Sequence, residues 1–296
     1  MTDRTTESLD FQAAYDAAHR RHLFSRRVKA GIAYFVLALF VVGSIGPFIY
    51  LISPALRDSV SIFSYPPQWI PETWYTGNIG FLFRETHYLR WALNTFIFAT
   101  AVTLITLVLD SLAGYAFARL RFPGKNVLFF LILATLMVPV AALLAPLYLM
   151  VKSMGLLNTY WGLILPMVVS PLGVFMMRQF ISTLPEALVE AARLDGASEW
   201  QVFRKIVLPL MKPAIVVLGI FTFMFQWVNF LWPLVITTTD DMKTLTVGIA
   251  SLQGQFVTDW GVISAAAVMT MVPVVIIFLI FQRWFVQASM AGALKQ

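Results

Sequence analysis

Long uncharged runs separate short polar segments along this chain of 296 residues. A helix rises 1.5 Å per residue, so about 20 apolar residues cross the hydrocarbon core of a bilayer, which is about 30 Å thick. Six runs meet or approach that length, and only the second contains a carboxylate, Asp110. The pattern predicts an all-α polytopic membrane protein. The six expected spans are 30–53, 93–117, 127–150, 161–177, 214–237 and 263–285.

The composition supports this interpretation and narrows the chemistry. Hydrophobic residues make up 59% of the chain and charged residues 12%, against about 45–50% and about 25% in soluble domains. These values exclude a water-soluble globule. The chain has no cysteine, which excludes disulfides, thiolate catalysis and cysteine-bound metals.

The distribution of basic residues predicts the orientation of the spans. Lys and Arg remain in the cytoplasm far more often than they cross the membrane. A cytoplasmic N-terminus leaves most of the 21 basic residues inside, so both termini are expected there. Residues 1–29 form a polar cytoplasmic arm without a secretory signal, and residues 30–296 form the membrane domain. The basic residues expected outside are Arg57, Arg84, Arg90, Lys152 and Lys243.

An inner loop at about 178–213 is too long to be a simple turn. Thr183 and Glu186 have the spacing of a capping box, which predicts a helix that runs to Leu194. The turn at 195–197 then breaks this helix, because Gly196 permits a positive φ. We expect a first short helix followed by a glycine hinge.

A second capping box, Ser198 with Gln201, predicts another helix that continues to Val207. Trp200 and Phe203 lie at helical spacing, so this helix is expected to present both rings on one face. A loop of this size has no core of its own to cover them. Periodicity alone leaves two explanations open: a protein partner, or an amphipathic helix that lies on the membrane.

The inner loop resembles the EAA loop of ABC importer permeases. Two further stretches, 115–125 and 155–160, resemble the carbohydrate branch of that family, and the likeness runs from about Asn94 to the C-terminus. The second permease of a maltose-type pair is the most similar kind of subunit. The residues that carry the likeness in the inner loop are Glu190, Ala191, Ala192, Asp195, Gly196, Ala197, Phe203, Pro209 and Pro213.

The resemblance implies a type I-like permease domain over residues 30–296 in a bacterial inner membrane. It makes the helix 198–207 a coupling helix that docks on a separate ATPase. The implied partners are a second, non-identical permease, two ATP-binding subunits and an extracytoplasmic solute-binding protein, with no nucleic acid. The residues expected to dock are Glu190, Ala191, Ala192, Asp195, Gly196, Ala197, Trp200 and Phe203.

The chain itself is not expected to be an enzyme. Gly124-Lys125 is the only candidate for a phosphate-binding loop, and it lacks the first glycine and the following Ser or Thr. We therefore expect no catalytic residue and no cofactor on this chain, with ATP and Mg²⁺ used by the partner. His19 and His22 are three residues apart, but no further ligand accompanies them, so no metal is expected.

Polar residues in the fifth span are candidates for the transport path. Gln226 and Asn229 fall on one expected helical stripe beside Trp227, and Asn94 of the second span is another candidate. Polar groups in spans face cavities or one another, so hydrogen bonding between packed helices is an equal alternative. The resemblance also implies that sugar contacts lie largely on the partner permease. For Asp110, a structural bond and a gating role both remain open.

Sequence and resemblance together predict a subunit of an ATP-driven importer of sugars or oligosaccharides. Glycerol phosphate, a polyol or an acidic oligosaccharide is the alternative cargo. A membrane-embedded transferase or a passive channel is a rival from another class. The outer segment 237–261 resembles the loop with which this family reaches a binding protein, and the terminal residues 292–295 are candidates to contact the ATPase.

Overall fold

The computed structural model describes residues 3–59, 61–66, 68–253 and 259–293, with side chains between residues 26 and 282 of these ranges. The side chains of His19 and His22, Gly254, and the terminal Leu294 and Lys295 therefore lie outside the described residues. Within them, all regular structure is helical, as predicted.

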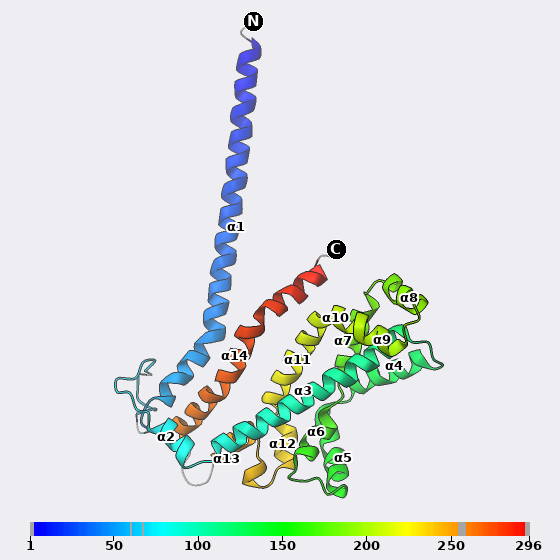
Figure 1. Cartoon of the computed structure of the whole chain (residues 1–296). Helices are drawn as coiled ribbons and strands as arrows, with labels where there is room; N and C mark the ends of the chain where they lie inside the picture. The colour runs from blue at the N-terminus through cyan, green and yellow to red at the C-terminus, as the bar shows by residue number, and fades with distance from the viewer. Residues whose placement is uncertain (1–2, 60, 67, 254–258, 294–296) are drawn as a thin grey trace.

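The helices follow one another with short connections, except for a longer loop between the first two (Figure 1). The first half of the chain forms α1 (Asp3–Ala55), α2 (Gly77–Arg84), α3 (Tyr88–Arg119), α4 (Lys125–Ala134), η1 (Thr135–Met137), α5 (Val140–Ser153), α6 (Tyr160–Ile164) and η2 (Leu165–Met167). The second half forms α7 (Pro171–Ser182), α8 (Glu186–Leu194), α9 (Glu199–Val202), η3 (Phe203–Val207), α10 (Leu208–Leu210), α11 (Lys212–Trp227), α12 (Leu231–Ile236), η4 (Asp240–Met242), α13 (Leu245–Ser251) and α14 (Trp260–Ala293).

Among the described residues, three unbroken helices are long and apolar enough to cross a membrane. They are residues 26–55 of α1, the whole of α3, and residues 260–282 of α14. Helix α1 continues without a break through the expected boundary at residue 29. Three bent helix pairs bring the total to six if each pair is one span.

The third expected span is bent, not straight. The chain bends by 103° between its two parts, Lys125–Met137 and Val140–Ser153. Val138 is extended at the break, because Pro139 disfavours a helical conformation in the residue before it. The fourth expected span is also a bent pair, because α6–η2 and α7 are bent by 47° just before Pro171.

The fifth expected span, 214–237, is also interrupted, so the prediction of one helix there was wrong. Helix α11 ends at Trp227, and α12 begins only at Leu231. In the gap, the Asn229 amide group donates to Gln226 Oε1, and the Thr246 hydroxyl donates to the Asn229 carbonyl. These bonds replace helical ones, which is how short polar side chains compete with a helix.

Helix α3 lies at the centre of the bundle, where it packs against α7 and α11. Helix α1 packs against α14 at the side. Helices α8, α9 and α10 lie at one end of the bundle, here called the α8 end, toward which the C-terminal part of α14 also runs (Figure 1). Helices α2, α12 and α13 lie at the opposite end, here called the α13 end.

Candidate functional site

The candidate docking site is residues 183–211, here called the docking loop. Its first predicted capping box is absent: the Thr183 hydroxyl donates to the Phe180 carbonyl, and Pro185 precedes α8. The second is present, because Ser198 accepts from the Gln201 amide while Gln201 accepts from the Ser198 amide. Helix α8 ends at Leu194, as predicted.

The turn between α8 and α9 is a Schellman motif. The Ala197 amide donates to the Ala192 carbonyl, and the Gly196 amide donates to the Arg193 carbonyl. Gly196 has φ +82°, which confirms the expected glycine hinge. A β-carbon added at Gly196 meets no atom within 4 Å, so the backbone conformation alone requires glycine there.

Trp200 and Phe203 do not share an outward face. Trp200 is 58% exposed, whereas Phe203 is 5% exposed and lies against Tyr115 of α3, with ring centroids 5.3 Å apart. The chain forms a π-helical turn, η3, from Phe203, and this turn directs Phe203 and Val207 into the bundle. The expectation that the Phe203 ring is presented outward was therefore wrong.

The other residues expected to dock lie near one another on the docking loop. Glu190, Ala191, Asp195 and Gly196 are exposed, whereas Ala192 and Ala197 are half-buried against the core of the loop. Leu194, which the sequence analysis missed, is 89% exposed. Its position inside the EAA-like stretch was the signal that would have found it. The exposed surface is thus Leu194, Gly196 and Trp200, with Glu190 at its side.

Basic side chains join the elements at the α8 end of the bundle. Arg119 donates to the carbonyls of Ile181 and Leu184, at 2.9 and 2.5 Å. Arg178 donates to the Phe117 carbonyl and lies over the Phe129 ring, 4.1 Å from its centroid. Basic residues that predicted the membrane orientation from the sequence therefore also donate hydrogen bonds to backbone carbonyls near helix ends.

A polar cluster joins three elements beneath the loop. The Tyr115 hydroxyl of α3 donates to Glu199 Oε2 at 2.5 Å. Arg193 of α8 donates to both oxygens of Glu199, at 2.8 and 3.2 Å. The hydrogen bonds from Arg193, and to a smaller extent that from Tyr115, hold the pKa of the Glu199 carboxyl below its ordinary value. Tyr115 and Glu199 are 84 residues apart, so periodicity gave no signal of the contact.

The predicted stripe through Gln226 and Asn229 is interrupted, because α11 ends at Trp227 and α12 begins only at Leu231. Asn94 is fully buried, donates to the carbonyls of Asp241 and Lys243, and accepts from the Tyr160 hydroxyl. The Trp227 ring donates to the Thr270 carbonyl. Gln226 and Asn229 are bonded to each other. All four transport-path candidates thus make hydrogen bonds within the chain. A role in the transport path stays a prediction.

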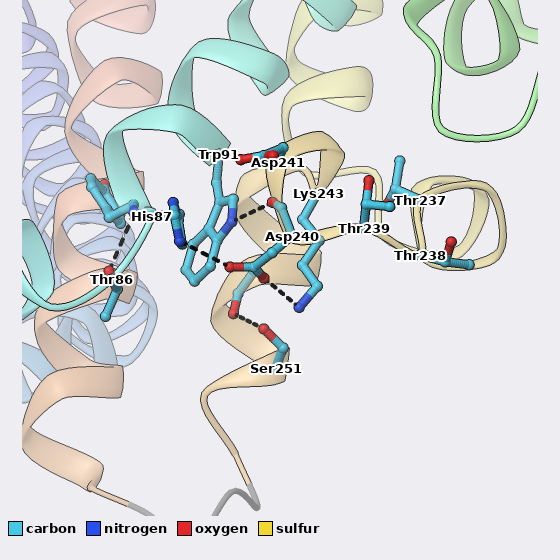
Figure 2. Close-up of polar contacts among 12 residues, drawn as sticks. Thr86, His87, Trp91, Thr237, Thr238, Thr239, Asp240, Asp241, Lys243 and Ser251 are labelled. Carbon is cyan, nitrogen blue, oxygen red and sulfur yellow. Dashed lines mark hydrogen bonds and ion pairs between the residues drawn. The ribbon is translucent and has the colours of Figure 1, made fainter.

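At the α13 end, α3 holds the loop 237–245 (Figure 2). Besides the two bonds from Asn94, the Trp91 ring donates to the Asp240 carbonyl at 3.1 Å. The Asp240 carboxylate contacts Lys243 at 2.7 Å and His87 at 3.5 Å. His87, the residue before α3, is thus beside an aspartate.

Asp110 is fully buried beside the start of α7, and its Oδ1 accepts from the Ser170 amide at 3.4 Å. A β-carbon on Gly173 would lie 2.0 Å from its other oxygen. The carboxylate therefore occupies the space that glycine leaves at the bend between α6 and α7.

This arrangement can be compared with known proteins. Residues 110–289 match the sequence profile of the family described as binding-protein-dependent transport system inner membrane component. This chain belongs to that family. The permease is accordingly a non-catalytic, multi-pass subunit of the inner membrane.

Relatives match most of the permease. It is 38% identical over 226 residues to the arabinooligosaccharides transport system permease protein AraQ of Halalkalibacterium halodurans, which covers 76% of this chain and 81% of the relative. It is 36% identical over 248 residues to the sn-glycerol-3-phosphate transport system permease protein UgpE of Yersinia pestis, which covers 81% and 88%.

A solved structure shares the fold. A chain of a bacterial ABC transporter involved in the import of the acidic polysaccharide alginate superposes with a TM-score of 0.78. The match covers 88% of this chain and 98% of that chain, at 21% identity. The bent helix pairs therefore belong to an architecture already seen in a membrane transporter.

Proposed function

We propose that this permease transfers motion from a cytoplasmic ATPase to the membrane spans of an oligosaccharide importer. The observation that carries the proposal is the exposed apolar surface of the docking loop, Leu194, Gly196 and Trp200, on a rigid turn. Large exposed apolar side chains on an ordered turn are typical of an interaction site. Membership of the family favours a protein partner over the membrane surface.

The proposed orientation places the α8 end in the cytoplasm. Arg119, Lys125, Arg178 and Lys212 lie in or beside the elements at this end, and Lys and Arg are enriched in cytoplasmic segments. Both termini would then be cytoplasmic. The six spans would consist of the three long helices, the two bent pairs within 125–153 and 160–182, and α11 with α12. Residues 199–210, which form the first part of the third bent pair, would stay in the cytoplasm as part of the docking loop. The loop 237–245 would face the outside.

The proposed complex contains a second, non-identical permease, two ATP-binding subunits and a solute-binding protein. ATP and Mg²⁺ would be used by the ATP-binding subunits, and this chain would bind no cofactor. Support for a binding protein comes from the family itself, whose members serve binding-protein-dependent transport.

Oligosaccharides of the arabinose type are the proposed cargo, because AraQ proteins match at 38% and 36% identity. The second candidate is sn-glycerol-3-phosphate, which UgpE relatives favour at 36% identity. The two differ in charge, so uptake of each by vesicles that contain the complex and its binding protein would separate them. Competition by the unlabelled compound gives the specificity.

Docking is tested with the complex purified from cells that express all its subunits. Trp200→Ala and Gly196→Asp should each reduce co-purification of the ATPase and ATP hydrolysis stimulated by loaded binding protein. Trp74→Ala is the matched control, because Trp74 is also exposed but lies in the loop before α2. Normal assembly and normal stimulated hydrolysis by Gly196→Asp would refute the docking role.

A further inference from the structure

Tyr115 of α3 contacts both α9 and the π-helical turn η3 that follows it. Tyr115 is buried within α3, its ring lies against Phe203, and its hydroxyl donates to Glu199. Ring packing resists separation of the two elements, and a directional hydrogen bond resists sliding. A displacement of α9 and η3 together is therefore opposed by two interactions at the same residue of α3.

Glu199 is held from two sides. It is the first residue of α9, and Arg193, in the last turn of α8, donates to both its carboxylate oxygens. Oε2 is shared between Tyr115 and Arg193. Hydrogen bonds between charged partners, and two-point arginine contacts above all, fix geometry better than neutral bonds do. The bonds join α8 and α9 across the Gly196 turn, so the two helices are braced as one body.

The ion pair between Arg193 and Glu199 is too exposed to contribute much to the stability of the fold. The side chains of Arg193 and Glu199 are 37% and 45% exposed, and such pairs contribute little to folding. The pair also borders an open hollow of about 870 Å³, lined by Arg119, Glu190 and Leu194. A partner seated on Glu190 and Leu194 would thus lie directly beside it.

We infer that Glu199, oriented by Arg193, is the positioning residue that passes displacement of α9 to α3 through the Tyr115 hydroxyl. This inference rests on the proposed docking function and adds the contact by which docking reaches the spans. It assigns a role to three residues that are not part of the apolar surface formed by Leu194, Gly196 and Trp200.

The test compares Tyr115→Phe, Glu199→Gln and the double variant in the complete complex in lipid vesicles. Tyr115→Phe keeps the ring that packs on Phe203 and removes only the donor. In Tyr115→Phe, assembly and basal ATP hydrolysis should be unchanged, whereas substrate transported per ATP hydrolysed should fall by roughly fivefold or more. The maximal transport rate should fall. The concentration of loaded binding protein at which transport is half-maximal should stay the same. The double variant should transport no less per ATP than the more impaired single variant, because both substitutions act on the same contact.

Two further variants sharpen the result. Arg193→Lys keeps a charged donor and should retain more coupling than Arg193→Gln. Glu186→Gln is the control, because it neutralises a carboxylate of the same loop that lies outside the polar cluster.

The outcomes separate this inference from the proposed function. Normal transport per ATP by Tyr115→Phe would overturn the inference while docking stands. Loss of assembly by Tyr115→Phe would also overturn it, because the bond would then be structural. If the unaltered chain fails to bind the ATPase, the proposed function itself is wrong.

Discussion

At the scale of single residues, Asp110 and Gly173 fit closely against each other. The carboxylate fills the position where any other residue at 173 would place its β-carbon. Burial of a carboxylate in a membrane span is costly, and such residues face the bundle interior and find polar partners. Here the partner is the Ser170 amide at the start of α7.

Gly173→Ala should therefore destabilise the permease by about 1–3 kcal/mol through overpacking. Asp110→Ser shortens the opposing side chain, so the double variant should recover part of the loss. Thermal unfolding of the purified complex in detergent measures both effects. Gly80→Ala is the control, because a β-carbon there meets no atom within 4 Å. A double variant less stable than Gly173→Ala would contradict this account.

Gly196 gives a second prediction with a different cause. Its positive φ makes a β-carbon unfavourable by about 1 kcal/mol, although space is free around it. Gly196→Ala should speed hydrogen exchange at the Ala197 amide, which the turn protects. Gly196→Asn should do so less, since asparagine tolerates left-handed conformations. Equal exchange in the two variants would show that backbone conformation is not the cause.

At the scale of elements, the sequence predicted what local rules determine. The end of α8, the Ser198–Gln201 cap and the positive φ of Gly196 follow from short-range chemistry and were all confirmed. The end of α11 was missed, because it depends on a hydrogen bond from Thr246 to Asn229. Phe203 was placed outward because a regular period cannot anticipate a π-helical turn. The Tyr115–Glu199 contact needs the tertiary fold.

The turn between α5 and α6 offers a test of how one residue holds a distant loop. Asn158 has φ +54°, and its side chain bonds to both Thr238 and Thr239. Asn158→Gly keeps the conformation and removes these bonds, so the Thr238 and Thr239 amides should exchange roughly tenfold faster or more. Asn158→Ala adds backbone strain and should destabilise the turn further. Unchanged exchange in Asn158→Gly would show that the loop is held elsewhere.

At the scale of the whole molecule, the proposed orientation is testable because the chain contains no cysteine. Single cysteines are placed at Glu186, at the α8 end, and at Ile70, an exposed residue of the loop between α1 and α2. A membrane-impermeant maleimide should label Ile70→Cys in intact spheroplasts and Glu186→Cys only after permeabilisation. The reverse pattern would invert the orientation.

Helix α3 meets the loop 237–245 through Trp91 and the docking loop through Tyr115. Some 36 Å of unbroken helix separates these two residues, at 1.5 Å per residue. Thermodynamic linkage is reciprocal. In the proposed complex, if the ATPase changes the affinity of the outer face for the loaded binding protein, then binding of that protein must change the conformational equilibrium of the ATPase. The coupling free energy is the same in both directions. Helix α3 would then carry the coupling in both directions. ATP hydrolysis in the absence of loaded binding protein would be kept low without a separate regulatory domain.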